Sequence, residues 1–192
     1  EADRMHDMGF IPQIRRVLAA LPEKRQTLMF TATMPPDVER IARRSMKDPV
    51  RVQIGVTAPA QRARQELFEL PEEGKAPLLL KLLAKSQGRV LVFVRTKRGV
   101  DRLARTIGAR GFHAVRIHGD LEQTHRDKSL AEFRHGRCRV LVATDIAARG
   151  LDIDQLEAVI NVDITPDPAT HTHRIGRTGR ADQAGWAFSL AS

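Results

Sequence analysis

Short runs of aliphatic residues alternate along this chain with longer segments in which apolar residues recur every three or four positions. The aliphatic runs have the length and composition of buried strands. They are residues 26–33, 50–55, 89–96, 113–119, 138–145, 158–164 and 186–192. The periodic segments predict helices over residues 10–21, 35–48, 76–88, 99–111 and 121–136. Because parallel strands need long crossover connections, this alternation predicts an α/β fold with a parallel sheet flanked by helices.

The alternating pattern is interrupted between residues 55 and 65. Apolar periodicity stops there, and small, polar and basic residues take over, as in a linker. A chain of 192 residues has room for one full domain and part of another. We therefore expect a shorter unit over residues 1–54, a linker over 55–65 and a full domain over 66–192.

The composition is that of a folded globular protein with a basic surface. Hydrophobic residues make up 42% of the chain and charged residues 29%, which argues against intrinsic disorder. The formal net charge of +9 is spread along the chain and favours a polyanionic partner. Cys138 is the only cysteine, so no internal disulfide forms. Since no apolar run reaches the roughly 20 residues of a membrane span, we expect a cytoplasmic protein that does not enter membranes.

Polar residues follow four of the expected strands. They are residues 31–33, 95–97, 118–120 and 144–145. In an open parallel sheet, ligands bind beyond the carboxyl ends of the strands, so these residues predict a site along one edge of the sheet. The segment 144–154 adds Arg149 and Asp152, whose side chains suit a phosphate and a ribose hydroxyl. The alternative for that segment is a turn between two strands.

Three arginines at three-residue intervals form the most unusual pattern in the chain. Arg174, Arg177 and Arg180 lie within residues 171–182, and glycines stand beside the last two. Glycine is a poor helix former, whereas a guanidinium group on bare backbone suits close approach by a planar anion. The pattern is compatible with a phosphate-binding segment and equally with a solvated basic loop.

Five sequence motifs occur in a fixed order over nearly the whole chain. They are EAD (1–3), TAT (31–33), VFVRT (92–96), TDIAARGLDI (144–153) and HRIGRTGR (173–180). With these motifs the chain resembles the DEAD-box ATP-dependent RNA helicases. Residues 118–123 and 166–180 are most similar to the DbpA-like bacterial branch of that family.

The resemblance implies that two RecA-like domains close over ATP and single-stranded RNA. Residues 1–54 resemble the C-terminal part of the first RecA-like domain, and residues 66–192 resemble a complete second one. For the nucleotide, it implies that Arg177 and Arg180 reach the γ-phosphate, with Arg180 as the arginine finger, and that Asp152 contacts the ribose.

Further residues take catalytic and coupling roles by the same resemblance. Glu1 corresponds to the catalytic carboxylate that positions the attacking water, and Asp3 corresponds to the residue that couples that site to the second domain through His173. Thr31 and Thr33 correspond to residues that link hydrolysis to strand separation. Thr31 replaces the usual serine and keeps its hydroxyl group.

The resemblance also implies a set of contacts to RNA. The residues are Arg95, Thr96, Gly119, Gln123, Arg126, Thr144 and Arg149. Such contacts hold the RNA backbone without reading base order, so we expect weak sequence preference, with ribosomal RNA as one candidate partner. The alternative for Arg126 is a surface ion pair with Glu122, four residues earlier on the expected helix.

The chain contains no GxxxxGK[ST] phosphate loop, and the aspartate that the family uses through Mg²⁺ would precede Glu1. ATP and Mg²⁺ thus require a missing part of the first domain, and we expect the isolated chain to lack ATPase activity. Residues 1–54 are expected to be mobile or paired with another copy. Three other interpretations remain: a non-catalytic RNA-binding module, a DNA-directed relative, and a metal site at His171 and His173.

Overall fold

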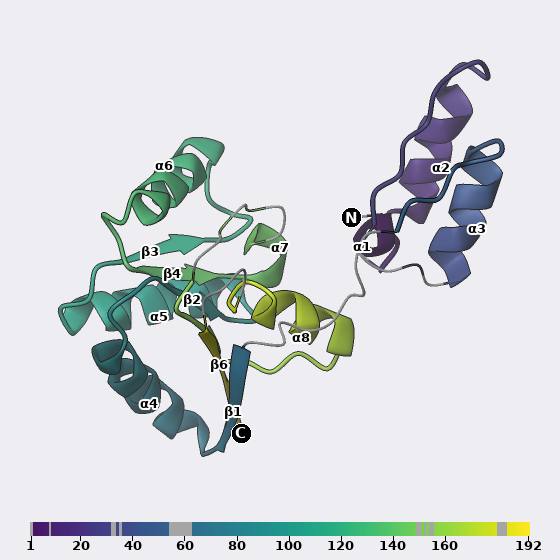
Figure 1. The fold of residues 1–192 in the computed structure, drawn as a ribbon. Coiled ribbons are helices and arrows are strands. Elements are labelled where there is room, and N and C mark those ends of the chain that lie inside the picture. The colour runs from purple at the N-terminus through teal and green to yellow at the C-terminus, as the bar shows by residue number, and fades with distance from the viewer. Residues whose placement is uncertain are drawn as a thin grey trace. The chain divides into compact units, whose positions relative to one another are not determined.

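A computed structural model describes residues 2–7, 9–31, 34, 36–53, 63–148, 151, 153, 156–179 and 184–192 (Figure 1). The chain divides into two compact units, Glu1–Ala58 and Pro59–Ser192, called unit 1 and unit 2 below. In the described part of the chain, no helix is long and apolar enough to cross a membrane.

Unit 2 is built on a six-stranded parallel sheet with the order β1-β6-β5-β2-β4-β3. Its strands are β1 (Ala63–Glu69), β2 (Val90–Phe93), β3 (Ala114–Ile117), β4 (Val140–Ala143), β5 (Ala158–Asn161) and β6 (Gly185–Ala191). The α/β fold with a parallel sheet expected from the alternating pattern is confirmed.

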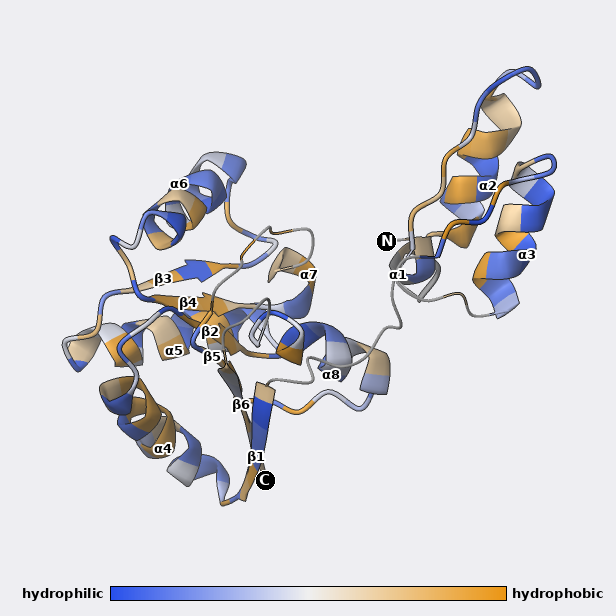
Figure 2. Cartoon of the chain, in the orientation of Figure 1, coloured by the Kyte–Doolittle hydropathy of each residue, from blue (hydrophilic) through white to orange (hydrophobic). Residues whose placement is uncertain are grey.

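Helices cover both faces of this sheet (Figure 1). They are α4 (Glu72–Lys85), α5 (Lys97–Ala109), α6 (Gln123–Arg134), α7 (Asp145–Ala148) and α8 (Pro168–Ile175). Neighbouring residues of a strand point to opposite faces, so Val90 and Val92 of β2 pack with α4 and α5, while Leu91 and Phe93 pack with α6 and α7. Figure 2 shows the resulting apolar centre and the polar outer sides of the helices.

Strand β1 lies at an edge of the sheet and begins at Ala63, inside the span for which composition predicted a linker. It pairs in parallel with β6 from Ala63↔Gly185 to Glu69↔Ala191. Its sequence, ARQELFE, is mostly polar because most of its side chains are exposed. The pattern of hydrophobic residues therefore did not predict this strand.

Unit 1 contains α1 (Ala2–Asp7), α2 (Ile11–Ala20) and α3 (Pro36–Ser45). The strands expected over 26–33 and 50–55 do not form in the described residues 26–31 and 50–53. Their apolar side chains point to solvent: Leu28 is 71% exposed, Phe30 76%, Val50 90% and Val52 76%. A strand needs a neighbouring strand, and the described part of unit 1 contains none, although the main-chain oxygen of Phe30 accepts a hydrogen bond from the N–H of Ala2 at 3.1 Å. The prediction of strands here was wrong for that reason.

Candidate functional site

The carboxyl ends of β2, β3 and β4 bring three of the sequence-predicted segments to one edge of the sheet. Phe93 of β2 and Ile117 of β3 both lie in register with Ala143 of β4. The main-chain N–H of Thr144 then donates to the oxygen of Ile117 at 3.3 Å. The segments that begin at Val94, His118 and Thr144 therefore leave the sheet next to one another.

Thr96 caps the N-terminus of α5. Its hydroxyl oxygen accepts a hydrogen bond from the main-chain N–H of Gly99 at 3.0 Å. A Cβ atom on Gly99 would lie 2.9 Å from that hydroxyl oxygen and 2.7 Å from Val94 Cγ1, so only glycine fits. Since a hydroxyl that accepts a bond still carries a proton, exposed Thr96 can hold the helix and donate to a phosphate. The sequence did not identify Gly99 as part of this arrangement.

Gly119 lies exposed just after β3, next to the start of α5. A Cβ atom there would be 3.7 Å from Lys97 Cε, an ordinary contact, so the fold itself does not require glycine. The ammonium group of Lys97 binds the carboxylate of Asp120. This hydrogen bond and the positive charge of Lys97 hold the pKa of Asp120 below its usual value.

Gln123 and Arg126 lie on the first turn of α6 and contact each other. Arg126 Nη1 donates to Gln123 Oε1 at 3.1 Å, and Gln123 Nε2 donates to Asp127 Oδ1 at 2.8 Å. Arg126 Nε is shielded from solvent and has no partner in the described part of the chain. No ion pair joins Arg126 to Glu122, whose carboxylate lies 3.9 Å from His125 Nδ1 instead. The surface-pair alternative for Arg126 is therefore not observed.

Arg174 is buried at the centre of the site, with 3% of its surface exposed. Its Nε and Nη2 donate to the two carboxylate oxygens of Asp145 at 2.6 and 2.7 Å. Its Nη1 donates to Asn161 Oδ1 at 3.2 Å and to the main-chain oxygen of Asp163 at 2.6 Å. The guanidinium group also lies over the ring of Phe93, 5.0 Å from the centroid. One side chain thus ties α8 to the carboxyl ends of β2, β4 and β5.

The same network reaches Arg95. Asp163, whose main-chain oxygen binds Arg174, accepts a hydrogen bond from the main-chain N–H of Arg95 at 2.8 Å. The guanidinium group of Arg95 stays mostly exposed, 4.0 Å from the Asp163 carboxylate. Arg95 therefore has a fixed backbone and an outward side chain.

Arg174 shares the three-residue spacing that raised the possibility of a phosphate-binding segment, but its side chain is buried in the interior of unit 2. Arg177, two residues beyond the end of α8, is half-buried, and its Nη1 donates to the main-chain oxygen of Leu151 at 2.9 Å. His173 lies half-exposed on α8, whose N-terminus is capped by Asp167. The role of Arg174 depends on Asp145, 29 positions earlier, a pairing that no local pattern indicates.

Unit 1 brings two predicted residues together. The main-chain N–H of Asp3 donates to Thr31 Oγ1 at 3.3 Å, and Asp3 is buried. The EAD and TAT motifs, 28 residues apart, are therefore in contact. Five further predicted residues lie outside the described residues: Glu1, Thr33, Arg149, Asp152 and Arg180.

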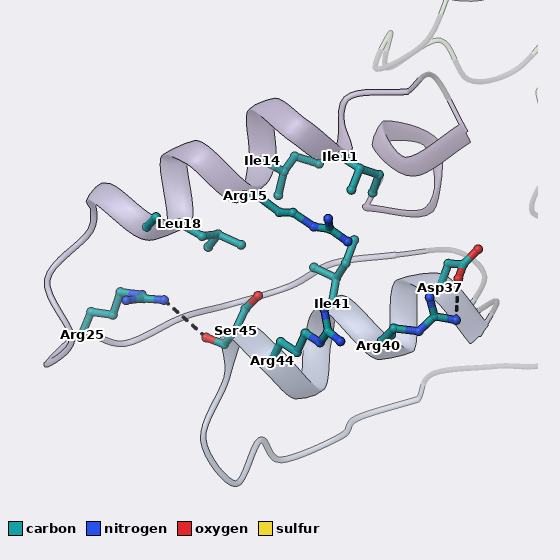
Figure 3. Close-up of a pocket in the computed structure, with 11 residues that line it drawn as sticks. Ile11, Ile14, Arg15, Leu18, Arg25, Asp37, Arg40, Ile41, Arg44 and Ser45 are labelled. Atoms are coloured by element: carbon teal, nitrogen blue, oxygen red, sulfur yellow. Dashed lines mark hydrogen bonds and ion pairs between the residues drawn. The ribbon is translucent and has the colours of Figure 1, made fainter.

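A hollow of about 330 Å³ lies between α2 and α3 in unit 1 (Figure 3). Ile11, Ile14, Leu18 and Ile41 contribute apolar side chains. The arginines that line it are Arg15, Arg25, Arg40 and Arg44. The sequence analysis did not predict it, although the helical spacing of the apolar residues on α2 is visible in the sequence.

His171 on α8 has a shifted pKa, and the structure bears on the metal site considered for it. Burial and the charge of Arg174 lower the pKa of His171. Among the described residues, no group of three histidine, cysteine or acidic side chains is arranged to hold a metal ion. The described residues thus offer no further ligands for a metal site at His171 and His173.

Comparison with protein families gives two matches along the chain. The helicase conserved C-terminal domain matches residues 74–182, and the DEAD/DEAH box helicase family matches residues 1–41. In three dimensions, the chain is similar to S. cerevisiae Dbp5 bound to RNA and ADP BeF3, with a TM-score of 0.87 and 32% identity. That match covers 100% of this chain and 51% of the Dbp5 chain.

Two bacterial relatives match over the whole chain. The ATP-dependent RNA helicase DbpA of Escherichia coli is 44% identical, and the match covers 100% of this chain and 42% of DbpA. CshA of Geobacillus kaustophilus is 45% identical with the same coverage, so identity does not separate the DbpA-like branch from others. The chain thus spans less than half the length of these relatives. From the motifs, the RecA-like sheet and these matches, the chain belongs to the DEAD-box family of helicases.

Proposed function

We propose that this chain forms the C-terminal half of the core of an ATP-dependent RNA helicase, which couples RNA-stimulated ATP hydrolysis to local duplex unwinding. Residues 66–192 act as the second RecA-like domain, and residues 1–54 as the C-terminal part of the first. The observation that carries the proposal is the Arg174 network. It links the segments that carry Arg95 and Thr144, two of the proposed RNA contacts, to α8, which precedes Arg177.

RNA binds along the carboxyl edge of the sheet in this proposal. Thr96 donates its hydroxyl proton to a phosphate, and Arg95 and Arg126 supply positive charge. Gly119 has no side chain, so the sugar-phosphate backbone can approach its main chain closely. Because a Cβ atom there would meet no obstacle from the fold itself, RNA binding rather than folding accounts for glycine in this proposal. Thr144 and Arg149 complete the set, although buried Thr144 has little surface to offer.

ATP binds on the side of α8. Arg177 is anchored by the oxygen of Leu151 and presents positive charge at the surface, which fits a phosphate group. Arg180 acts as the arginine finger and Asp152 contacts the ribose. Glu1 positions the attacking water, while Asp3, Thr31, Thr33 and His173 couple hydrolysis to RNA binding. ATP, bound with Mg²⁺, supplies the phosphoryl group. The protein loop that binds its phosphates belongs to a further part of the first domain.

The Asp3–Thr31 contact supports the coupling role. A hydrogen bond between the catalytic motif and the TAT motif lets a shift in one segment reach the other. Because the N–H of Asp3 belongs to the first turn of α1, it has no partner within that helix. The hydroxyl of Thr31 supplies that partner.

Two measurements test the proposal. First, the 192-residue chain is expected to bind a labelled single-stranded RNA, and Arg126→Gln to weaken this binding, with Lys81→Gln on α4 as a charge-matched control. Second, a chimera that places the preceding residues of DbpA before Glu1 is expected to hydrolyse ATP when RNA is added. RNA binding without hydrolysis by the chimera would favour the non-catalytic RNA-binding module, and absence of RNA binding would contradict both.

A further inference from the structure

A row of arginines follows the proposed RNA contacts along α5. Arg98, Arg102 and Arg105 are spaced by four and three residues, which places them on one face of the helix over about 10 Å. All three are exposed. Together with Thr96, Gly99 and Asp101 they line a hollow of about 390 Å³, called the α5 groove below.

The arginines of the α5 groove form no close ion pair within the described part of the protein. The hydrogen bond from Lys75 and, to a smaller extent, the charge of Arg102 lower the pKa of Glu72, and Arg105 Nε donates to the main-chain oxygen of Asp101 at 3.3 Å. No carboxylate there lies within 4 Å of the guanidinium nitrogens of Arg98, Arg102 or Arg105. Asp101 is the one acidic residue of the lining. Its Oδ1 is already bound by Arg116 Nε at 2.8 Å and His118 Nε2 at 3.1 Å.

Like charges four residues apart destabilise a helix slightly, so this row does not serve the stability of α5. The lining also contains no large apolar or aromatic side chain, although such side chains anchor most protein partners. Guanidinium groups around a polar hollow suit phosphate groups, which they bind through paired hydrogen bonds. The chemistry of the groove therefore favours a nucleic-acid backbone over an acidic protein segment.

We propose that the α5 groove binds the phosphates of an RNA segment that extends beyond the one held at Thr96 and Gly119. This inference rests on the proposed function, because it assumes that RNA reaches the start of α5. Thr96 belongs both to the proposed RNA contacts and to the groove lining, so a strand that leaves Thr96 enters the groove directly. Arg102 and Arg105 then lengthen the RNA footprint without reading its sequence.

The test compares two RNA lengths and two matched double variants of the 192-residue chain. Single-stranded RNAs of about 4 and about 16 nucleotides span the usual site sizes of single-strand-binding folds. Arg102→Gln with Arg105→Gln removes two charges from the groove, and Lys81→Gln with Lys85→Gln removes two exposed charges from α4. Binding is measured by fluorescence anisotropy at several salt concentrations, and the sole tryptophan, Trp186, reports folding.

The groove variant is expected to bind the longer RNA roughly tenfold more weakly at low salt. Its plot of log K against log salt should be shallower by about 1.4, since each phosphate contact contributes about 0.7 for a single strand. Binding of the short RNA should not change, and Arg102→Lys with Arg105→Lys should retain most of the affinity. The α4 control should behave as wild type with both RNAs.

Two results overturn the inference, and a third overturns only the proposed contacts at Thr96 and Gly119. If the groove variant binds the longer RNA with the affinity and salt dependence of wild type, the groove does not bind RNA and is either solvated or a site for an acidic protein. An equal loss for both lengths would place the arginines inside the first binding segment. If the wild-type chain binds only the longer RNA, and this binding depends on Arg102 and Arg105, the proposed contacts at Thr96 and Gly119 fail while the groove stands.

Discussion

The main-chain N–H of Asp3 donates a hydrogen bond to the hydroxyl oxygen of Thr31 at 3.3 Å, across 28 residues of sequence. The bond joins the start of α1 to the segment that precedes α3. It is a contact between two motifs to which the resemblance assigns separate coupling roles.

Thr31→Val is expected to weaken this contact, because valine keeps the shape of threonine without the acceptor oxygen. Loss of one partner of a buried main-chain donor costs about 1–3 kcal/mol. Hydrogen exchange of the Asp3 amide should become faster, as measured by NMR. Thr31→Ser keeps the hydroxyl group and is the control. Equal amide protection in both variants would contradict a role for this bond.

Arg174→Met is expected to destabilise unit 2 strongly. The change leaves the Asp145 carboxylate without its bidentate partner, and breaking a buried pair in this way costs about 3–5 kcal/mol. Because Asp145 retains some exposure, we expect a value near the lower limit. Urea unfolding followed by Trp186 fluorescence measures the effect, since Trp186 lies on β6.

Two variants refine this experiment. Arg174→Lys should recover only part of the stability, because an ammonium group does not reproduce the planar fork that binds both carboxylate oxygens. Arg110→Met, at the exposed end of α5, should leave the urea midpoint of unit 2 unchanged. A midpoint for Arg174→Met equal to that of wild type would show that the network does not stabilise the fold.

Two glycines of the same helix should respond to alanine in opposite ways. In Gly99→Ala, the new Cβ would lie 2.7 Å from Val94 Cγ1, and such overpacking costs about 1–3 kcal/mol. At Gly108 a Cβ meets nothing within 4 Å, so Gly108→Ala should stabilise α5 by up to about 1 kcal/mol. Thermal unfolding measures both. An unfolding temperature of Gly99→Ala equal to or above that of wild type would contradict the packing described around Thr96.

His171 should make stability depend on pH. Burial and the nearby charge of Arg174 lower its pKa in the folded state, so the unfolded chain binds the proton more readily. The free energy of unfolding should therefore fall as pH decreases below the ordinary histidine pKa of about 6.5. Above that pH, His171 is neutral in both states and contributes no pH dependence.

Replacing His171 by asparagine should remove this contribution. Urea unfolding of the two proteins between about pH 5 and pH 8 gives the difference in unfolding free energy, which cancels the effect of other titrating groups. The loss of stability toward acid should be smaller in His171→Asn. Parallel curves for both proteins would contradict a lowered pKa at His171.

The central strands of unit 2 were predictable because they are buried on both faces and appear as continuous aliphatic runs. Strand β1 was not predictable. It lies at the edge of the sheet and pairs only with β6, so most of its side chains are exposed and polar and form no aliphatic run. In unit 1, Leu28 and Phe30 have strand-like sequence, but strand formation depends on a partner outside the local sequence. The sequence pattern there indicates residues that favour strands, but the described residues 26–31 do not form one.

The position of the candidate site in unit 2 followed from a general property of parallel sheets, so the segments with Thr96, Gly119 and Thr144 were identified by where their strands end. The fourth segment expected at that edge begins at Thr31, which lies in unit 1, where no strand forms among the described residues. The interior role of Arg174 was not predictable from spacing. Its partners Asp145, Asn161 and Asp163 come from separate segments, and only the folded chain brings them together. Gly99 was missed for a similar reason, because its requirement arises from Val94 and Thr96 around it.

The salt bridge between Arg174 and Asp145 also limits how this protein can diverge. A single replacement at either position strands a charge inside the fold, whereas simultaneous replacement by apolar residues of similar volume avoids that penalty. Descendants of this sequence should thus retain both residues or lose both.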